Sequence, residues 1–426
     1  MKERRVLAGA FVRTLVLHQV LRRRWLIDLW QKWNVQRLRR HAVHNVAFYR
    51  PFEKTPFEAF PIVGKSDVMA SFEAFNCPGF SAPQVWNMIE KGAAPPGYDV
   101  GCSTGTSGNR GLYLVSDAER FRWLGTILAK AVPDVLWTRH RVAVLLPRMS
   151  RLYAAANESR LVKLLFLDLA QGLDQLAGPL SEFAPTVIVA PPAALRWIAD
   201  TKLAVRPSHV FSGAEVLDPM DRKAIEVYFG VTVREIYMAT EGLFGVSCKH
   251  GTLHLAEDAV HFECEPFGDD PLLATLIVTD FTRRTQVLAR YRMNDLVRLK
   301  TAPCPCGSAF RAVEDVIGRC DDVFWLPRRA GEEDVQITPD VLRNAVLGAD
   351  RSIEDFRVYQ TGANHIDLVL PPQILQSAAD AALFDLERAC EIAGAAPSIT
   401  LKRGIISAPP GRKLRRVEKK WNGTAR

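Results

Sequence analysis

The feature that most constrains the fold of this chain is the loop over residues 102–111, in which glycines alternate with small hydroxyl residues. It reads Cys-Ser-Thr-Gly-Thr-Ser-Gly-Asn-Arg-Gly. Glycine lets the backbone turn tightly and approach a ligand closely, and successive backbone N–H groups in such a turn form a concave anion site. The loop is not a Walker A motif, which requires Gly-Lys-Ser/Thr at its end. A polyphosphate is the natural ligand; a flexible surface loop is the alternative.

The composition is that of an ordinary globular protein with room for two or three domains. The 426 residues are 48% hydrophobic and 24% charged. Because no long uncharged apolar run is present, we expect no transmembrane helix and a cytoplasmic location. Eight cysteines are spread over the chain, two of them as Cys-x-Cys, which favours a metal site over a disulfide framework.

Positive charge is concentrated at the N-terminus. Residues 1–50 hold 12 Lys/Arg and two Asp/Glu, whereas the whole chain has a net charge of +8. The remainder is slightly acidic in sum, so we expect no nucleic-acid binding by the fold as a whole. Apolar residues recur at near-helical spacing in 1–50, and Arg13 and His18 interrupt them, which argues against a signal peptide. We expect basic helices packed on the main domain or a partner; a peripheral helix on anionic lipid is the alternative.

From residue 101 short apolar runs alternate with helix-length segments. This rhythm predicts an α/β fold with parallel or mixed sheets covered by helices, whose ligands gather at the carboxyl ends of strands. The polar segments 212–215 and 238–241 directly follow predicted strands, and residues beyond 356 indicate a small α+β lid. The predicted strands are 142–146, 186–190, 209–211, 233–237, 272–279, 287–291, 296–299, 356–359 and 366–370, and the predicted helices are 117–131, 192–202, 218–229 and about 376–393.

Five stretches, in order, resemble the acyl-adenylate-forming enzymes, the superfamily of acyl-CoA synthetases, adenylation domains and luciferases. They are the loop at 102–111, Ser-Gly-Ala-Glu at 212–215, Tyr-Met-Ala-Thr-Glu at 237–241, Tyr-Arg-Met-Asn-Asp-Leu at 291–296 and Gly-Arg-Cys-Asp-Asp at 318–322. Phe-Pro-Ile-Val-Gly-Lys-Ser-Asp at 60–67 and Cys-Pro-Cys-Gly at 304–307 further resemble the phenylacetate–CoA ligase-like branch. The predicted organisation is a basic helical segment (1–55), a large N-terminal domain of mixed sheets covered by helices (56–320) and a small C-terminal α+β lid domain (321–426).

The resemblance implies ATP-dependent activation of a carboxylic acid to an acyl-AMP, followed by transfer to the thiol of CoA or of a carrier-protein phosphopantetheine. Such an enzyme must hold the triphosphate, neutralise developing charge and orient the carboxylate. The resemblance implies a phosphate cradle formed by Ser103, Thr104, Gly105, Thr106, Ser107 and Gly108, with Arg110 adding charge. It implies an adenine pocket lined by Gly213, Ala214 and Glu215, with Tyr237 stacked on the adenine. It further implies that Thr240 bonds the α-phosphate, Glu241 holds magnesium, Asp295 accepts hydrogen bonds from the ribose hydroxyls, and Arg319 and Lys413 assist catalysis.

Two departures from the family pattern leave alternatives open. Arg110 and Gly111 stand where the family usually has proline and then lysine or threonine. Residues 323–335, where the family lines its thiol tunnel, are bulky and then charged. An adenylating amide synthetase is therefore one alternative, and a degenerate nucleotide-binding member that acts as an interaction module is another.

Four residues suggest a metal site. Cys304 and Cys306 form a thiolate pair, and Cys248 and His254 lie upstream around a glycine. Together they make a Cys₃His set, the ligand set of a closed structural zinc site. Such a zinc would cross-link the strand after Glu241 to the loop after Asp295. Four unlinked residues, or a set that includes Cys264 or Cys320, are the alternatives.

The acid and the partners are less defined by the sequence. We expect the acid pocket between residues 142–160, Phe211 and residues 237–244. Tyr153, Phe211, Met238 and Phe244 suggest an aryl or other apolar acid, unless they belong to the core. The basic N-terminal segment is compatible with an acidic carrier protein, and a homodimer is allowed.

Overall fold

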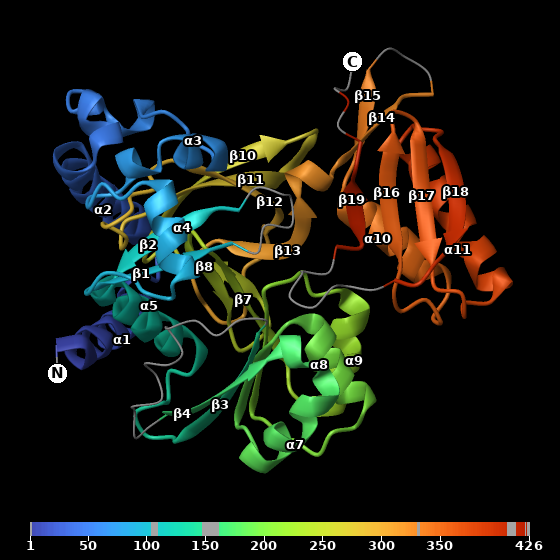
Figure 1. Ribbon diagram of the computed structural model, residues 1–426, viewed down its shortest axis with the longest axis horizontal. Coiled ribbons are helices and arrows are strands. Elements are labelled where there is room, and N and C mark those ends of the chain that lie inside the picture. Colours follow the sequence, from blue (N-terminus) through green and yellow to red (C-terminus); the bar gives the residue numbers. More distant parts are fainter. Residues whose placement is uncertain are drawn as a thin grey trace.

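The computed structural model describes residues 2–103, 110–146, 162–329, 333–406, 415–421 and 423. In this part the chain forms a large α/β unit and a smaller C-terminal α+β unit, which lie side by side (Figure 1). The predicted fold class is therefore confirmed.

One 11-stranded sheet runs through the large unit in the order β10-β11-β12-β13-β9-β8-β7-β6-β5-β3-β4. The strands from β4 to β7 pair parallel, and those from β7 to β10 pair antiparallel. The bounds are β3 (His140–Leu146), β4 (Val162–Asp168), β5 (Val187–Ala190), β6 (His209–Gly213), β7 (Val233–Ala239), β8 (Gly242–Ser247), β9 (Leu253–Leu255), β10 (Val260–Phe267), β11 (Asp270–Asp280), β12 (Tyr291–Lys300) and β13 (Ala312–Arg319).

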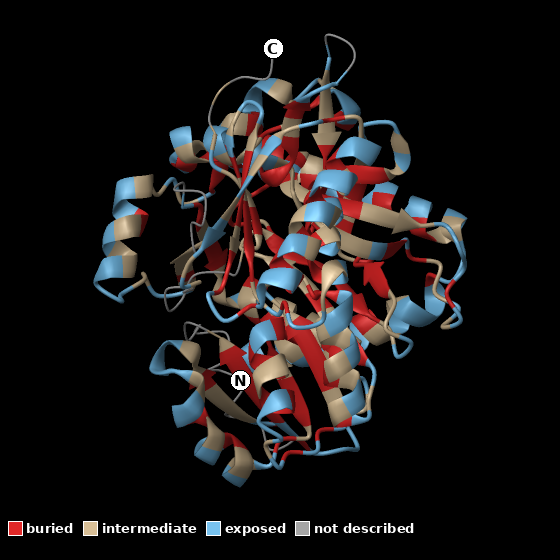
Figure 2. Ribbon diagram, turned by 90° about the vertical axis from the view of Figure 1, so that its right-hand side faces the viewer, coloured by how far each residue is buried: buried red, intermediate tan, exposed pale blue. Residues whose placement is uncertain are grey.

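Helices cover both faces of the parallel half. Alternate residues of a strand point to opposite faces, so Ala143 and Leu145 pack in the core under α7 (Leu173–Phe183), α8 (Pro192–Asp200) and α9 (Pro219–Phe229). Val142 and Val144 face the other way and pack in the core with α5 (Asp117–Ala131). A short 3-10 turn, η5 (Leu169–Gln171), precedes α7. Figure 2 shows the strands as a buried layer.

The antiparallel half differs from the prediction at one point. Residues 287–291 and 296–299 are not separate strands: β12 runs unbroken over Tyr291–Lys300. The polar residues Arg292, Asn294 and Asp295 suggest a break in the sequence, but β12 pairs with β11 on one side and β13 on the other, with bulges in both ladders. The backbone N–H and C=O groups of this polar segment are therefore hydrogen-bonded by the neighbouring strands, which keeps it in the sheet.

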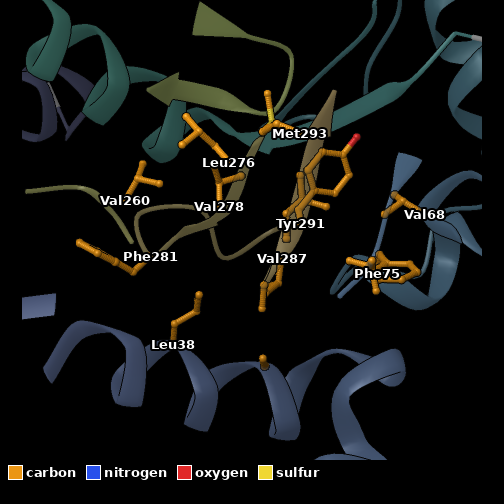
Figure 3. Close-up of a cluster of buried hydrophobic side chains, with 14 of the residues drawn as sticks. Leu38, Val68, Phe75, Val260, Leu276, Val278, Phe281, Val287, Tyr291 and Met293 are labelled. Carbon is orange, nitrogen blue, oxygen red and sulfur yellow. The ribbon is translucent and has the colours of Figure 1, made fainter. Parts of the chain in front are cut away.

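The N-terminal helices pack on the large unit. Helix α1 (Lys2–Val20) crosses α5, and α2 (Arg24–Asn45) contributes Leu38 and Ala42 to the largest core, beside Phe75 and Val287 (Figure 3). No helix in the described ranges has the length and apolarity to cross a bilayer. The segments that follow are η1 (Ala47–Phe52), η2 (Phe57–Ala59), α3 (Lys65–Ala70), η3 (Phe72–Phe75), α4 (Ala82–Glu90), β1 (Tyr98–Cys102) and β2 (Leu112–Ser116).

The C-terminal unit has its own core, which contains Phe324, Phe356 and Leu386. A four-stranded sheet of order β18-β17-β16-β19 packs with two helices, and a two-stranded ribbon stands beside it. The bounds are η6 (Cys320–Asp322), β14 (Phe324–Pro327), β15 (Asp334–Ile337), α10 (Pro339–Ala349), β16 (Arg357–Gly362), β17 (His365–Leu370), α11 (Gln376–Ile392), β18 (Ser398–Arg403) and β19 (Val417–Lys419).

Gly125 sets how closely α1 approaches α5. A Cβ at this position would lie 2.3 Å from the carbonyl oxygen of Leu7, so Gly125→Ala must push the helices apart. We expect the free energy of unfolding, measured by urea denaturation, to fall by about 1–3 kcal/mol. Gly348→Ala near the end of α10 is the control, because its Cβ meets nothing within 4 Å. Equal stability of the two variants would contradict the close packing.

Candidate active site

A cavity of about 1820 Å³ opens at the carboxyl ends of the parallel strands and continues along the junction with the C-terminal unit. This is where an open α/β sheet binds ligands. The residues predicted for the site that line this cavity are Ser103, Gly213, Ala214, Glu215, Tyr237, Thr240, Glu241, Asp295 and Arg319.

The structure does not bring every predicted residue into the cavity. Arg110 is exposed and does not line it. Thr104, Gly105, Thr106, Ser107, Gly108 and Lys413 lie outside the described residues.

Asp295 and Arg319 lie opposite each other because β12 and β13 pair antiparallel in a register that partners them. Opposite residues share one face of a sheet. From β7, the Tyr237 hydroxyl donates to Asp295 Oδ2 at 2.9 Å. Burial and then the Asp295 charge raise the pKa of Tyr237 well above its ordinary value, so the phenol stays protonated as a donor. Three strands thus place an acid, a cation and an aromatic ring together.

Thr240 and Glu241 form the two-residue turn of the β7–β8 hairpin. The Glu241 carboxylate is held from two sides, because Thr240 Oγ1 donates to its Oε2 at 2.8 Å and the Tyr291 hydroxyl donates to its Oε1 at 3.0 Å. Beneath the turn, Arg283 Nη1 donates to the carbonyl oxygens of Thr240 and Glu241 at 3.0 and 2.6 Å. Tyr291 and Arg283 are therefore supporting residues that the sequence motifs did not single out as such.

Lys65 is a further cation in the cavity that the sequence did not single out. Backbone hydrogen bonds tie Val63 to the start of β12, which places Lys65, the first residue of α3, on the cavity wall. Burial lowers the pKa of Lys65, while the nearby charges of Glu241 and Asp321 raise it and that of Arg319 lowers it. Its ammonium therefore lies among the charged site residues.

The segment after β6 has an unusual backbone. Ala214 has a φ of 68°, a left-handed conformation that costs a residue with a Cβ and is concentrated at functional sites. The buried Ser212 hydroxyl lines the same part of the cavity and has no hydrogen-bond partner within the described chain. A strained backbone and a buried hydroxyl without a partner thus lie together at this strand end, a combination that is concentrated at functional sites.

The glycine-rich loop joins β1 to β2 at the tip of a hairpin. Its base is closed by Ser103, whose N–H donates to the carbonyl of Gly111 at 2.8 Å and whose Oγ accepts from the N–H of Gly111 at 2.8 Å. Cys102 and Ser103 line the cavity. The described base of the loop therefore lies at the cavity wall.

The four predicted metal ligands come together. One ligand atom from each of Cys248, His254, Cys304 and Cys306 lies within 4.8 Å of all the others. Cys248 Sγ is 3.6 Å from Cys304 Sγ, and Cys306 Sγ is 3.3 Å from His254 Nε2. The other ring nitrogen, Nδ1, lies 3.1 Å from the carbonyl oxygen of Phe310. That contact leaves Nε2 directed at the thiols, the arrangement expected of a metal-binding histidine.

Two glycine turns shape this cluster. Gly251 and Gly307 have φ of 79° and 74°, and their N–H groups donate to the carbonyls of Cys248 and Cys304, at 3.0 Å in both cases. A residue with a Cβ is strained in this conformation. Cys264 and Cys320, the alternate ligands, are not in the cluster.

A second arm of the cavity is apolar and lies between α5 and the parallel strands. Of the residues expected in the acid pocket, Phe211 and Met238 line it. Phe244 instead packs in the core with Tyr237 and Phe262, and Tyr153 lies outside the described residues. The described apolar lining also includes Trp123, Leu124, Ile127, Leu128, Val142, Val144, Val162, Leu164, Val187, Val189 and Ile236.

Ion pairs join the two units beside the cavity. Arg343 Nε of α10 lies 3.2 Å from Asp218 Oδ2 at the start of α9, with both side chains buried. Arg416 lies 3.7 Å from Asp221 of the same helix, and Arg196 of α8 lies 3.4 Å from Glu354. These contacts fix the C-terminal unit over the α8–α9 side of the large unit.

Comparison with known proteins gives matches among solved structures, whereas no protein-family model and no curated protein matches. A 2-hydroxyisobutyryl-CoA ligase in the postadenylation state has a TM-score of 0.68 at 18% identity, over 92% of this chain and 89% of that one. A GH3.15 acyl acid amido synthetase has a TM-score of 0.56 at 12% identity, over 88% and 85%. A fatty acyl-adenylate ligase of E. coli or L. pneumophila has a TM-score of 0.54 at 14% identity, over 73% of this chain and 66% of that one.

These matches establish that the chain has the fold of the acyl-adenylate-forming ligases. The TM-score also differs between structures of one ligase in different states. The 2-hydroxyisobutyryl-CoA ligase matches with TM-scores of 0.68 in its postadenylation state, 0.57 in an open conformation and 0.52 in its thioesterification state, over similar shares of the chain. Of these three structures, the one in the postadenylation state has the highest TM-score to this chain.

Arg283 supports the Thr240–Glu241 turn from below. Because Arg283→Met leaves two turn carbonyls without their donor, we expect the free energy of unfolding, measured by urea denaturation, to fall by about 2–4 kcal/mol. The control is Arg292→Met, which removes a partly exposed ion pair with Glu265 and should cost about 1 kcal/mol or less. A loss no larger than that of the control would show that the turn does not depend on Arg283.

Proposed function

We propose that this protein activates a carboxylic acid with ATP to give an acyl-AMP and then transfers the acyl group to a thiol. One observation carries the proposal. The Asp295–Arg319 pair, the Glu241 turn and the Ala214 strand end line one end of a cavity whose other arm is apolar. A nucleotide and an apolar acid can therefore meet at the carboxyl ends of the same sheet.

The polar end suits a nucleotide. The segment at Ala214 and the ring of Tyr237 would hold adenine, and the Asp295 carboxylate has two oxygens suited to a vicinal diol such as that of ribose. Arg319 and Lys65 would face the phosphates. Lys65 would supply a positive charge near the glycine-rich loop that the exposed Arg110 does not.

Glu241 is the residue we propose for magnesium. Magnesium takes hard oxygen ligands and is usually shared with substrate phosphates. Tyr291 and Thr240 hold the two oxygens of Glu241 in the cavity, which fits this use. The ion would neutralise charge on the triphosphate.

In the first step a carboxylate oxygen attacks the α-phosphorus of ATP, and the bond from that phosphorus to the pyrophosphate oxygen breaks. Negative charge develops at the α-phosphate, so donors aimed there lower the barrier. Thr240 and Lys413 are proposed for this role, Lys413 on its resemblance to the family lysine. In the second step a thiolate attacks the acyl carbon, AMP leaves with the former carboxylate oxygen, and the thiol proton passes to solvent.

The acid we propose is apolar. The described lining of the arm from α5, β3, β4 and β5 is aliphatic apart from Trp123, so burial of a hydrocarbon chain or ring there is favourable, at about 0.8 kcal/mol per methylene. Both aryl and long aliphatic acids belong to the apolar class that the sequence suggests.

CoA or a carrier-protein phosphopantetheine is the proposed acceptor, and an amine is a second candidate. The amine is favoured by one observation, the structural likeness to an acyl acid amido synthetase. Release of AMP that is stimulated by CoA, by a phosphopantetheine-loaded carrier protein or by amino acids would separate these acceptors.

A structural zinc is proposed for the Cys₃His cluster. Three thiol sulfurs and one imidazole nitrogen at mutual distances within 4.8 Å fit a closed tetrahedral site. The metal would hold the β12–β13 loop against β8 and β9. All eight cysteines are unpaired, which accords with a reducing cytoplasm.

Adenylation predicts acid-dependent exchange of labelled pyrophosphate into ATP. Across a panel of aryl and fatty acids we expect exchange with apolar acids, and we expect Lys413→Ala to reduce it by about 100-fold or more. Lys223→Ala, an exposed lysine on α9, is the matched control and should leave exchange unchanged. No exchange with any acid, despite measurable ATP binding, would favour the degenerate binding module.

Metal analysis tests the zinc proposal. Purified protein should contain about one zinc per chain, and Cys304→Ser should lose it and lower the thermal midpoint by several degrees. Cys77→Ser, at an exposed thiol outside the cluster, should keep both metal and midpoint. Protein that is free of zinc after expression in zinc-supplemented medium would rule the site out.

A further inference from the structure

The two N-terminal helices lie at the end of the molecule opposite the C-terminal unit (Figure 1), and each exposes large apolar side chains. Six large apolar side chains on α1 and α2 are each between 51% and 58% exposed. On each helix they are spaced four residues apart, so they form one stripe along its surface. They are Val12, Val16 and Val20 on α1, and Trp25, Leu29 and Trp33 on α2.

These stripes are not the faces by which the helices pack. Helix α1 buries Phe11 and Thr14 at α5, where Thr14 Oγ1 contacts Thr126 Oγ1. Helix α2 buries Ile27 and Leu38. Single exposed apolar residues are normal on a protein surface, but aligned groups of them mark an interaction site. Each helix therefore has an inner apolar face that is satisfied and an outer one that is exposed.

The surroundings of the stripes are strongly basic. Exposed acidic residues on the two helices are Glu3 and Asp28, and Asp28 is paired with Arg24 at 2.9 Å. Burial lowers the pKa of Arg284, and the positive charges of Arg37 and Arg122 lower it further, so positive charge gathers beyond the helices too. The exposed basic residues of α1 and α2 are Arg4, Arg5, Arg13, Lys32, Arg37 and Arg40, and the connection between the helices adds Arg22 and Arg23.

We propose that α1 and α2 dock the protein on an anionic lipid surface. Tryptophan and arginine are the residues that suit the boundary between headgroups and hydrocarbon, and each Lys or Arg near an anionic membrane contributes about 1 kcal/mol. A two-fold contact between copies of the chain through this face would set the basic residues against one another. An acidic acceptor protein would need to reach the cavity, which lies toward the C-terminal unit.

Docking at this face is independent of the proposed catalysis but has a consequence for it. Helix α1 packs directly on α5, whose Ile127 and Leu128 line the apolar arm. A membrane bound to α1 would therefore lie on the same side of the sheet as the arm, while the C-terminal unit stays in solvent.

The test is flotation of the full-length protein with vesicles of phosphatidylcholine alone or mixed with phosphatidylglycerol. We expect binding to the mixed vesicles only, decreasing as salt is raised. Replacing Trp25, Leu29 and Trp33 together by alanine should reduce binding by about 10-fold or more. So should the pair Arg22→Glu and Arg23→Glu.

The control is the double variant Phe384→Ala and Ile392→Ala on α11, where both side chains are at least as exposed as those of the stripes. It should bind vesicles as the unmodified protein does, and all variants should keep the thermal midpoint, because the changed side chains are exposed. No binding to mixed vesicles at low salt would overturn the proposal. The proposal would also be overturned if, in the absence of lipid, the protein formed a concentration-dependent dimer that the Trp25, Leu29 and Trp33 variant abolished. Binding to an acidic carrier protein that the same variant abolished would overturn it too.

Discussion

The pairing of β12 with β13 is the interaction on which the site depends. One end of this hairpin carries Asp295 opposite Arg319, and the loop at its other end carries Cys304 and Cys306 beside His254. A slip of one residue would turn every side chain of a strand to the other face. The proposed zinc in the Cys₃His cluster would hold the loop end of the hairpin, so a metal site remote from the cavity would support the geometry inside it.

Hydrogen bonds from supporting residues also hold the site in position. Arg283 holds the backbone of the Glu241 turn, while Tyr291 and Tyr237 donate to the two carboxylates of the site. Ion pairs such as Arg343 with Asp218 then seat the C-terminal unit over this assembly. The cavity therefore lies at the junction of the two units, with its polar end at β7, β12 and β13 and its apolar arm between α5 and the parallel strands.

The sequence predicted the fold class, four of the five parallel strands (β4 was missed) and most residues at the polar end, because glycine-rich and acidic motifs at strand ends have few structural uses. Sequence-based prediction failed where contacts between segments far apart in the chain decide the bounds of a strand or the direction of a side chain. Asp295 lies within an unbroken strand since β11 and β13 pair on both sides of it. Phe244 faces the core rather than the acid arm, and Lys65 reaches the cavity through a bridge between segments far apart in the chain.

The proposed function depends on attack by a carboxylate on the α-phosphorus of ATP in this cavity. The most direct measurement uses an apolar acid labelled with ¹⁸O in its carboxylate, together with ATP and a thiol acceptor, followed by mass spectrometry of the nucleotide products. We expect AMP that carries one oxygen from the acid, because the acyl-AMP bond is cleaved on the acyl side. Formation of ADP with the label in inorganic phosphate, or of unlabelled AMP, would contradict it.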